Sequence, residues 1–429
     1  MAIFTSNNGM NTKESGTRKR VSVSQLKPGV FVVDLDRSWF QTRFYFHRRL
    51  IKDAEDIELL KKHGIREVVI DTARGADIEA PRPAAEPSES EPAPEAIPET
   101  RPPSPAEAAF QSLTKEFQVA QTIHSEALTV AQIIFDGVGN GSPVNSPAAQ
   151  RVVTDLLGSI TRSPEANLLL TQMRRFQNDL FTHAVNVCVL CLVVGTLEEF
   201  KSEISALGLG ALLHDVGKTR MPRSLLRRKE PYTESERNLL EQHPKLGAAL
   251  LEPRENIPEL THRILVEHHE RVDGSGYPLG AEGPQISPFS QIVAITDAYD
   301  DMLMGGKHAP VQPIEVLRQL YLQGNGGAFD RDLIERVIRC LGVYPAGSLV
   351  ELNTGECGVV IAANRKDSLK PTLRIISSRD GLALSNGPII SLIDTDPGSI
   401  DRRIIRALDP GKERVNPLAY LKLTPAFAG

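Results

Sequence analysis

The sequence predicts a mainly α-helical protein, with a central all-helical domain, a small α+β domain before it and a small β appendage after it. Apolar residues recur at helical spacing from about 107 to 341, whereas short β-branched runs occur within 21–75 and 347–377. A proline-rich acidic segment at 76–105 separates the first part from the rest. At 429 residues the chain is long enough for two or three domains.

We expect five parts along the chain. They are a disordered N-terminus at 1–20, the α+β domain at 21–75, a linker at 76–105, the helical domain at 106–342, and the β appendage with its tail at 343–429.

The first domain is predicted to contain both strands and a helix. Residues 21–23, 30–33 and 68–70 have the β-branched composition of strands, and the Lys27-Pro28-Gly29 turn separates the first two. Residues 56–64 have helical spacing and end on a glycine. No catalytic constellation is evident in this part.

The segment 76–105 is predicted to be a linker because its composition cannot bury enough apolar surface to fold. It carries nine prolines, seven acidic residues and two arginines. Its net charge of −5 equals that of the whole chain, so the remainder is balanced.

The central region alternates amphipathic stretches with Gly, Pro and polar loops, and β-branched segments follow it. The expected helices include 148–160, 179–197, 204–213 and 234–251, and the expected strands are 349–352, 358–361 and 372–376.

Composition excludes several classes of protein. A balanced charge offers no broad basic field, so bulk nucleic-acid binding is not expected. The four cysteines do not form a disulfide framework, and we interpret Cys188 and Cys191 as buried helix thiols rather than a redox or metal pair. The N-terminus lacks a secretory apolar core, and the apolar run 185–195 is too short to span a bilayer. We expect a cytoplasmic protein with no membrane span.

The chemistry is concentrated between Asp179 and Asp300, a region that holds six of the ten histidines together with several aspartates. Imidazole with carboxylate and no thiolate is typical of a catalytic iron, manganese or zinc site. Adjacent polar pairs flanked by apolar helices are costly to bury unless a metal satisfies them. The members of this set are His183, His214, Asp215, His243, His268, His269 and Asp297.

Four ordered segments around these residues resemble the motifs of the HD-GYP branch of the HD phosphohydrolase superfamily. Residues 212–218 read LLHDVGK, similar to the HD signature, and residues 268–278 read HHERVDGSGYP, similar to the extended GYP motif. Between and after them, 241–247 read EQHPKLG and 294–300 read AITDAYD, which match the family's H-P-x-x-G element and D-x-x-D helix.

The resemblance covers roughly 161–342. Residues 21–75 also resemble a domain of unknown function that often precedes HD-GYP domains. The matching segments are LKPG at 26–29 and SW at 38–39.

The resemblance implies an all-helical phosphodiesterase that hydrolyses cyclic di-GMP to linear pGpG, with GMP left open as a further product. The seven His and Asp residues above become ligands of two or three divalent ions, iron or manganese, with Asp215 as the bridging carboxylate. Two close cations would generate hydroxide from a shared water near pH 7 and clamp the scissile phosphate. We leave open a homodimer and protein partners of the N-terminal domain.

Further residues are predicted to bind the substrate or to take part in catalysis. Lys218 lies at i+4 from His214 and can neutralise a phosphate oxygen, although a solvated helix-end lysine is the alternative. Glycines let the GYP loop approach a ligand, and its tyrosine can stack on guanine or bond to phosphate. The predicted substrate-binding set is Lys218, Gly276, Tyr277, Pro278, Asp300 and Lys307.

Asp179 has two interpretations. It precedes His183 by one helical turn, and some family members place there a glutamate that supports a third metal. The alternative is a helix-start acid that favours the helix dipole.

The sequence departs from the family after the D-x-x-D helix, where Ala-Leu and an R-P-Y arginine are usual. In this chain Asp301 comes directly after the D-x-x-D motif, and Gly306 occupies the position of the arginine that holds phosphate in the family. Lys307 can substitute, but only as a point charge. This gap favours one alternative, a catalytically weak or inactive regulatory module that acts through nucleotide and partner binding. A hydrolase for another nucleotide is a third interpretation, which the intact GYP loop disfavours.

Overall fold

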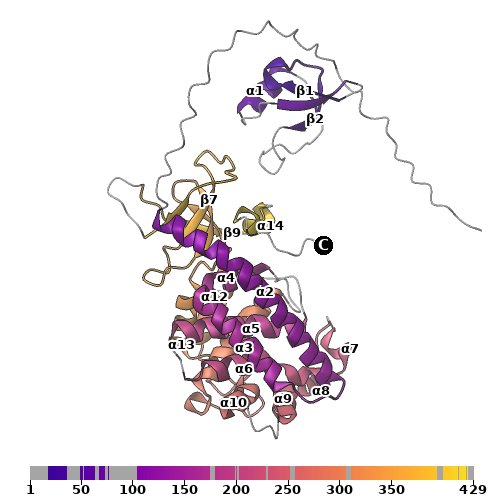
Figure 1. The fold of residues 1–429 in the computed structure, drawn as a ribbon, viewed down its shortest axis with the longest axis vertical. Coiled ribbons are helices and arrows are strands. Elements are labelled where there is room, and N and C mark those ends of the chain that lie inside the picture. Colours follow the sequence, from indigo (N-terminus) through magenta and orange to yellow (C-terminus); the bar gives the residue numbers. More distant parts are fainter. Residues whose placement is uncertain are drawn as a thin grey trace, which may run out of the picture. The chain divides into compact units, whose positions relative to one another are not determined.

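A computed structural model describes residues 18–35, 49–51, 53–62, 67–72, 76, 104–173, 179–198, 200, 202–228, 230–251, 257–305, 311–393, 400–413, 415–421 and 423. Most of 1–20 and of the predicted linker lies outside this range. The chain divides into two units, Met1–Arg101 with Ser378–Leu384 and Pro102–Ser377 with Ser385–Gly429. Each unit is described by itself (Figure 1).

The first unit contains an antiparallel sheet with the strand order β1-β4-β2-β3. Alternate strand residues and one helix face form its own small core, which includes Val32, Ile57 and Ile70. The α+β prediction is therefore confirmed. The elements are β1 (Arg18–Ser22), a 3₁₀ turn (Val23–Gln25), β2 (Phe31–Leu35), β3 (Arg49–Leu50), α1 (Ala54–Lys62) and β4 (Glu67–Asp71).

The second unit begins with α2 (Pro105–Gly139), which starts at a capping box. Ser104 Oγ accepts from the Glu107 amide at 3.2 Å, and Glu107 Oε2 accepts from the Ser104 amide at 2.8 Å. This reciprocal pair satisfies helix-end amides and defines where the prolines of the linker give way to helix.

The remaining elements of the helical region follow in chain order. They are α3 (Ser146–Arg162), α4 (Pro164–Met173), α5 (Leu180–Leu197), α6 (Ile204–Leu213), η3 (Val216–Arg220), α7 (Arg223–Leu226), α8 (Glu234–Leu240), α9 (His243–Leu251), α10 (Glu259–Glu267), η4 (Gly283–Gln285), α11 (Pro288–Met304), α12 (Pro313–Asn325) and α13 (Arg331–Leu341).

Helix α5 is the centre of the helical core. It packs against α2, α3, α4, α6, α11 and α13, and every residue from Thr182 to Gly195 is buried. By length and composition α5 could cross a membrane, but 78% of it is buried within the protein. The amphipathic pattern expected for 179–197 is therefore wrong, because a helix enclosed on all sides needs no polar face.

The two cysteines of α5 belong to this core. Cys188 Sγ lies 3.3 Å from the Gly208 carbonyl, and Cys191 Sγ lies 3.0 Å from Thr296 Oγ1. Burial raises the pKa of the Cys191 thiol to about 12. Such thiols remain protonated, so the interpretation as structural thiols is confirmed.

A five-stranded antiparallel sheet follows, with the order β8-β7-β6-β5-β9. The three predicted strands are confirmed, and two more extend the sheet at its edges. The elements are β5 (Leu349–Leu352), β6 (Cys357–Ala362), β7 (Thr372–Ser377), β8 (Ile389–Ser391), β9 (Ile404–Leu408), α14 (Pro410–Glu413) and α15 (Pro417–Tyr420).

Helix α2 connects this sheet to the helical core (Figure 1). Its first half contributes Leu113 and Phe117 to an apolar cluster with the sheet residues Leu349 and Val359. Its second half, from Ala127 onward, belongs to the larger helical cluster. One continuous helix thus packs against both parts of the unit.

Candidate metal centre

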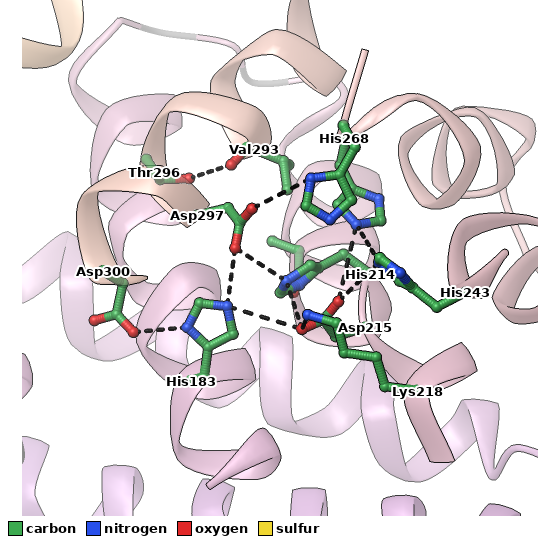
Figure 2. Close-up of polar contacts among 12 residues, drawn as sticks. His183, His214, Asp215, Lys218, His243, His268, Val293, Thr296, Asp297 and Asp300 are labelled. Carbon is green, nitrogen blue, oxygen red and sulfur yellow. Dashed lines mark hydrogen bonds and ion pairs between the residues drawn. The ribbon is translucent and has the colours of Figure 1, made fainter. Parts of the chain in front are cut away.

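The seven His and Asp residues identified by the motifs come from separate elements and meet in one place (Figure 2, where all of them except His269 are labelled). His183 lies in the first turn of α5, His214 ends α6, Asp215 precedes η3, His243 begins α9, His268 ends α10 and is followed by His269, and Asp297 lies in α11.

Gly217 allows two of these elements to approach closely. A Cβ atom on Gly217 would lie 2.0 Å from the His243 carbonyl oxygen and 2.6 Å from the Gly247 amide nitrogen. Only glycine permits this contact between η3 and α9. The contact brings the His214-Asp215 pair against His243.

Asp215 lies at the centre, and its two carboxylate oxygens face different histidines. Oδ1 lies 3.2 Å from His243 Nε2 and 3.9 Å from His268 Nε2. Oδ2 lies 3.6 Å from His214 Nε2 and 3.9 Å from His183 Nε2. This arrangement suits a carboxylate that bridges two ions.

Asp297 closes the other side of the cluster. Its Oδ1 lies 2.9 Å from His183 Nε2 and 3.6 Å from His214 Nε2, and its Oδ2 lies 3.9 Å from His269 Nδ1. The carboxylate is 4% exposed, so its charge is almost removed from bulk water.

Four of the imidazoles are oriented by an acceptor at Nδ1, which leaves Nε2 directed into the cluster. Such partners fix the tautomer of metal-binding histidines. The acceptors are Ala211 O for His214 at 2.7 Å, Leu240 O for His243 at 2.7 Å, Leu265 O for His268 at 2.9 Å, and Asp300 Oδ2 for His183 at 2.8 Å.

The resulting tautomers suit a bound cation. His243 Nε2 and His268 Nε2 face each other at 3.2 Å, while both Nδ1 atoms donate to carbonyl oxygens. Two neutral rings would therefore oppose their lone pairs. In addition, the buried Nε2 atoms of His214 and His269 have no hydrogen-bond partner among the described residues. These features fit a site that binds metal ions, because bound cations would satisfy these nitrogen atoms.

The protonation states of His268 and His269 favour metal binding. Burial and the neighbouring histidines hold the pKa of His268 well below its usual range, and burial does the same for His269. Both rings are therefore neutral near pH 7, which is the form that ligates metal.

Low pKa values keep Asp215 and Asp297 ionised, and the pKa of His183 shifts in the direction opposite to those of His268 and His269. Burial alone would raise the pKa of Asp215, but Lys218 and His214 hold it well below the usual range. Burial would lower the pKa of His183, yet hydrogen bonds to Asp297 and Asp300 raise it well above the usual value.

Within the described residues, three overlapping groups could each hold an ion. In each group, one ligand atom per residue lies within 4.8 Å of the others. The groups are Asp215 with His243, His268 and His269; His183 with His214 and Asp215; and His183 with Asp297 and Asp301. The buried clusters thus suit a centre of two or three metals.

Comparison with known proteins places this centre in a family. Residues 173–333 match an HD domain, 18–149 match a domain of unknown function (DUF3391), and 349–410 match a KOW domain associated with HD domains. The chain is 30% identical over 365 residues to the cyclic di-GMP phosphodiesterase PA4108 of Pseudomonas aeruginosa, covering 84% of this chain and 85% of that protein. It belongs to the HD-domain phosphodiesterases.

Two shorter or more distant matches were found. The cyclic di-GMP phosphodiesterase response regulator RpfG of Xanthomonas campestris is 34% identical over 150 residues, which is 34% of this chain and 39% of that protein. The solved structure of Bd1817, a HDG"Y"P protein from Bdellovibrio bacteriovorus, has a TM-score of 0.42 and 17% identity, covering 75% of this chain and 98% of that one.

Lys218 lies beside Asp215 in this phosphodiesterase. Its Nζ is 2.5 Å from Asp215 Oδ2, and its side chain is 21% exposed. Burial would lower the pKa of Lys218, but Asp215, Asp301 and Asp297 raise it above its usual value. The lysine is therefore charged and lies at the edge of the cluster rather than in bulk solvent.

The GYP loop is held against the same histidines. Glu270, which is 2% exposed, accepts from the amides of Leu279 at 2.6 Å and Ala281 at 2.9 Å. A Cβ atom on Gly276 would lie 2.4 Å from the Arg271 amide nitrogen. The Tyr277 ring stacks on His269 with centroids 4.7 Å apart, so one of its faces is already covered. Pro278 follows Tyr277 in this loop and is partly exposed.

Asp179 caps helix α5. Its Oδ1 accepts from the Thr182 amide at 2.8 Å, and Asp179 is in none of the ligand groups of the described chain. The observed contact is that of the helix-start acid; metal ligation by Asp179 stays a prediction.

Two predicted substrate residues need comment. Asp300 is 2% exposed and lies behind His183, with Oδ2 at Nδ1 and Oδ1 accepting from Asn186 at 3.1 Å. In this place the buried carboxylate orients the His183 ring, and substrate binding by Asp300 stays a prediction. Gly306 and Lys307 lie outside the described residues.

Two residues beside the centre were not predicted. Glu270 is adjacent to the histidine pair, but its role depends on amides nine and eleven residues later. Asp301 follows the D-x-x-D helix motif and lies one turn after Asp297, a spacing that the sequence itself displays.

Proposed function

We propose that this chain hydrolyses a phosphodiester bond of cyclic di-GMP to give linear pGpG, at a centre of two or three divalent iron or manganese ions. The observation that carries the proposal is Asp215, whose two oxygens face two separate sets of histidines in a buried site. The substrate follows from family membership and from the GYP loop beside His269.

The proposed ligands are the seven residues of the cluster. Asp215, His243, His268 and His269 would hold one ion, and His183, His214 and Asp215 would hold a second, with Asp297 closing the site. When bound, such ions acidify a shared water and offset the charge of the scissile phosphate.

The protein's own groups prepare the site for this chemistry. Carbonyl oxygens at Nδ1 keep three imidazoles in the tautomer that presents Nε2, and Asp300 does the same for His183. No ring has to reorient during turnover. This preorganisation reduces the reorganisation cost of the chemical step.

Lys218 is proposed to act on the substrate. Its ammonium group lies at the edge of the cluster, where it can neutralise a non-bridging phosphate oxygen as negative charge develops. Tyr277 and Pro278 would bound the nucleotide on the side of His269, with Gly276 letting the loop backbone lie close.

The proposal is tested by turnover with identified products. Protein purified without oxygen and loaded with Mn²⁺ or Fe²⁺ is incubated with cyclic di-GMP, 3′3′-cyclic GMP-AMP and linear pGpG, and the products are separated by chromatography. We expect metal-dependent conversion of cyclic di-GMP to pGpG, faster than conversion of the mixed dinucleotide. Tight nucleotide binding without turnover by metal-loaded protein would instead assign a regulatory module.

A further inference from the structure

The third ligand group contains a residue outside the motif set. One ligand atom each of His183, Asp297 and Asp301 lies within 4.8 Å of the other two. We propose that Asp301 is an additional metal ligand, which completes a cation position with His183 and Asp297 at the open side of the centre. This inference rests on the proposed metal centre and deepens it.

The placement follows from the geometry of α11. Asp297 and Asp301 are one helical turn apart and therefore share a face. Asp300 is turned away and binds His183 Nδ1 and Asn186. His183 Nε2 lies 2.9 Å from Asp297 Oδ1. It therefore faces the side of α11 that carries Asp297 and Asp301.

The exposure of the three residues shows where this position lies. His183 and Asp297 are 7% and 4% exposed, whereas Asp301 is exposed. The other two groups are formed by buried residues, apart from the partly exposed His269. Asp301 therefore lies at the solvent side, which substrate and exchangeable ligands can reach.

The charge of Asp301 would be unfavourable without a cation. Its carboxylate has no ion pair or hydrogen bond among the described residues, and the ammonium group of Lys218 is 2.5 Å from Asp215 instead. An unneutralised carboxylate beside a phosphodiester site repels the substrate, at an interaction energy of about 1 kcal/mol even in water at 4 Å. A bound divalent ion converts this repulsion into a contact that favours the phosphate.

Two features of the chain are consistent with this assignment. Asp179, the other acid near His183, directs its Oδ1 to the Thr182 amide as the cap of α5. Asp301 occupies a position where the family pattern usually has alanine, and alanine could not ligate. Asp301 is therefore the acid that can bind a cation at the open side of the centre, whereas Asp179 caps helix α5.

The test measures metal binding and does not depend on turnover. Chelator-stripped wild type, Asp301→Ala, Asp301→Asn and Asp215→Ala are titrated with Mn²⁺, and bound metal is counted by mass spectrometry. Asp155→Ala is the matched control, since Asp155 is an exposed acid on α3 far along the chain from the motifs. Circular dichroism melting verifies that all variants fold.

We expect both Asp301 variants to weaken one Mn²⁺ site by roughly 10-fold or more, the scale for losing a group that supports a metal. The tighter sites and the control should be unchanged, and Asp215→Ala should lose metal broadly. Wild-type stoichiometry and affinity in Asp301→Ala, with loss in Asp215→Ala, would overturn this inference alone. Wild type that binds neither Mn²⁺ nor, in a parallel titration without oxygen, Fe²⁺ would overturn the proposed function as well.

Discussion

At the scale of single residues, the centre depends on side chains whose environments fix both direction and charge. Backbone carbonyls orient His214, His243 and His268, and carboxylates orient His183. These contacts separate two kinds of residue, those that hold the ions and those that act on substrate. The two kinds respond differently to substitution.

Lys218→Ala should retain bound metal and slow hydrolysis of cyclic di-GMP by roughly 10²-fold or more, the scale for removing one charge stabiliser. The reason is that Lys218 touches Asp215 from the edge of the cluster and is not a ligand. Metal content and kcat are measured together, with Lys245→Ala, an exposed lysine on α9, as the control. Metal loss in parallel with the rate would show that Lys218 is structural.

Metal-free protein should lose stability between about pH 6.5 and 5, because an unfolded histidine titrates near 6.5. His268 and His269 have lowered pKa values when folded, so below that pH only the unfolded state gains their protons. The raised pKa of His183 acts in the opposite sense, but its contribution is complete below the unfolded pKa and is lost only as pH rises. The lowered pKa of Asp215 matters only in stronger acid.

Urea unfolding in the presence of a chelator at the two pH values measures this effect. His268→Gln should reduce the dependence on pH, whereas His262→Gln, on the same helix α10, should not. A metal-free protein that is equally stable at both pH values would contradict neutral buried imidazoles.

At the scale of elements, close contacts between backbones bring the ligands together. Gly217 lets η3 lie on the start of α9, and Gly276 lets the GYP loop lie on the backbone that follows His269. A side chain at either glycine would push apart elements that carry ligands.

Gly217→Ala should destabilise the fold by about 1–3 kcal/mol, the usual cost of inserting a methyl group into filled space, and should weaken metal binding. The added Cβ would lie 2.0 Å from the His243 carbonyl oxygen. Gly158→Ala is the matched control, since its Cβ meets only the end of Arg162 at 3.8 Å within a helix. That control should gain up to about 1 kcal/mol from helix propensity. Equal stability of the two variants would show that the η3–α9 contact is loose.

Most of the helices and the ligand residues could be predicted from the sequence, because helical periodicity and the four motifs are local signals. The seven predicted ligands do meet, although no local pattern specifies the 3.2 Å approach of His243 to His268. The single helix expected at 234–251 is two helices, α8 and α9, and Pro244 in the first turn of α9 was a readable sign of the second start.

Other features could not be predicted because they depend on tertiary contacts. Strand β8 has only three residues, and β9 carries Arg406, which pairs with Glu351 on β5. Neither has a clear apolar alternation. The role of Asp300 likewise depends on His183, which lies 117 residues away in sequence.

At the scale of the molecule, α2 makes the helical domain and the C-terminal sheet one unit. Leu113 and Phe117 of α2 are buried in the cluster that includes Leu349 and Val359. The N-terminal unit has a separate core that includes Val32 and Ile70. The two ends of the chain should therefore respond differently to truncation.

Deletion of 343–429 should destabilise the helical domain and promote aggregation, because it exposes the apolar face of α2 and α4 to water. Deletion of 1–103, which keeps the Ser104 cap, should leave the melting temperature of the remaining unit close to its original value. Calorimetry of the two truncated chains makes the comparison. A stable, monomeric chain ending at 342 would show that the sheet is not needed to cover α2.

We propose that the cluster around Asp215 is a metal centre that hydrolyses a cyclic dinucleotide. The most direct test of this proposal is the simultaneous measurement of bound metal and cyclic di-GMP turnover in wild type and Asp215→Ala, both loaded with Mn²⁺ or Fe²⁺. Because Asp215 faces both sets of histidines, the variant should lose most of its metal and all detectable hydrolysis while remaining folded. Full activity in a metal-replete Asp215→Ala preparation would contradict the account.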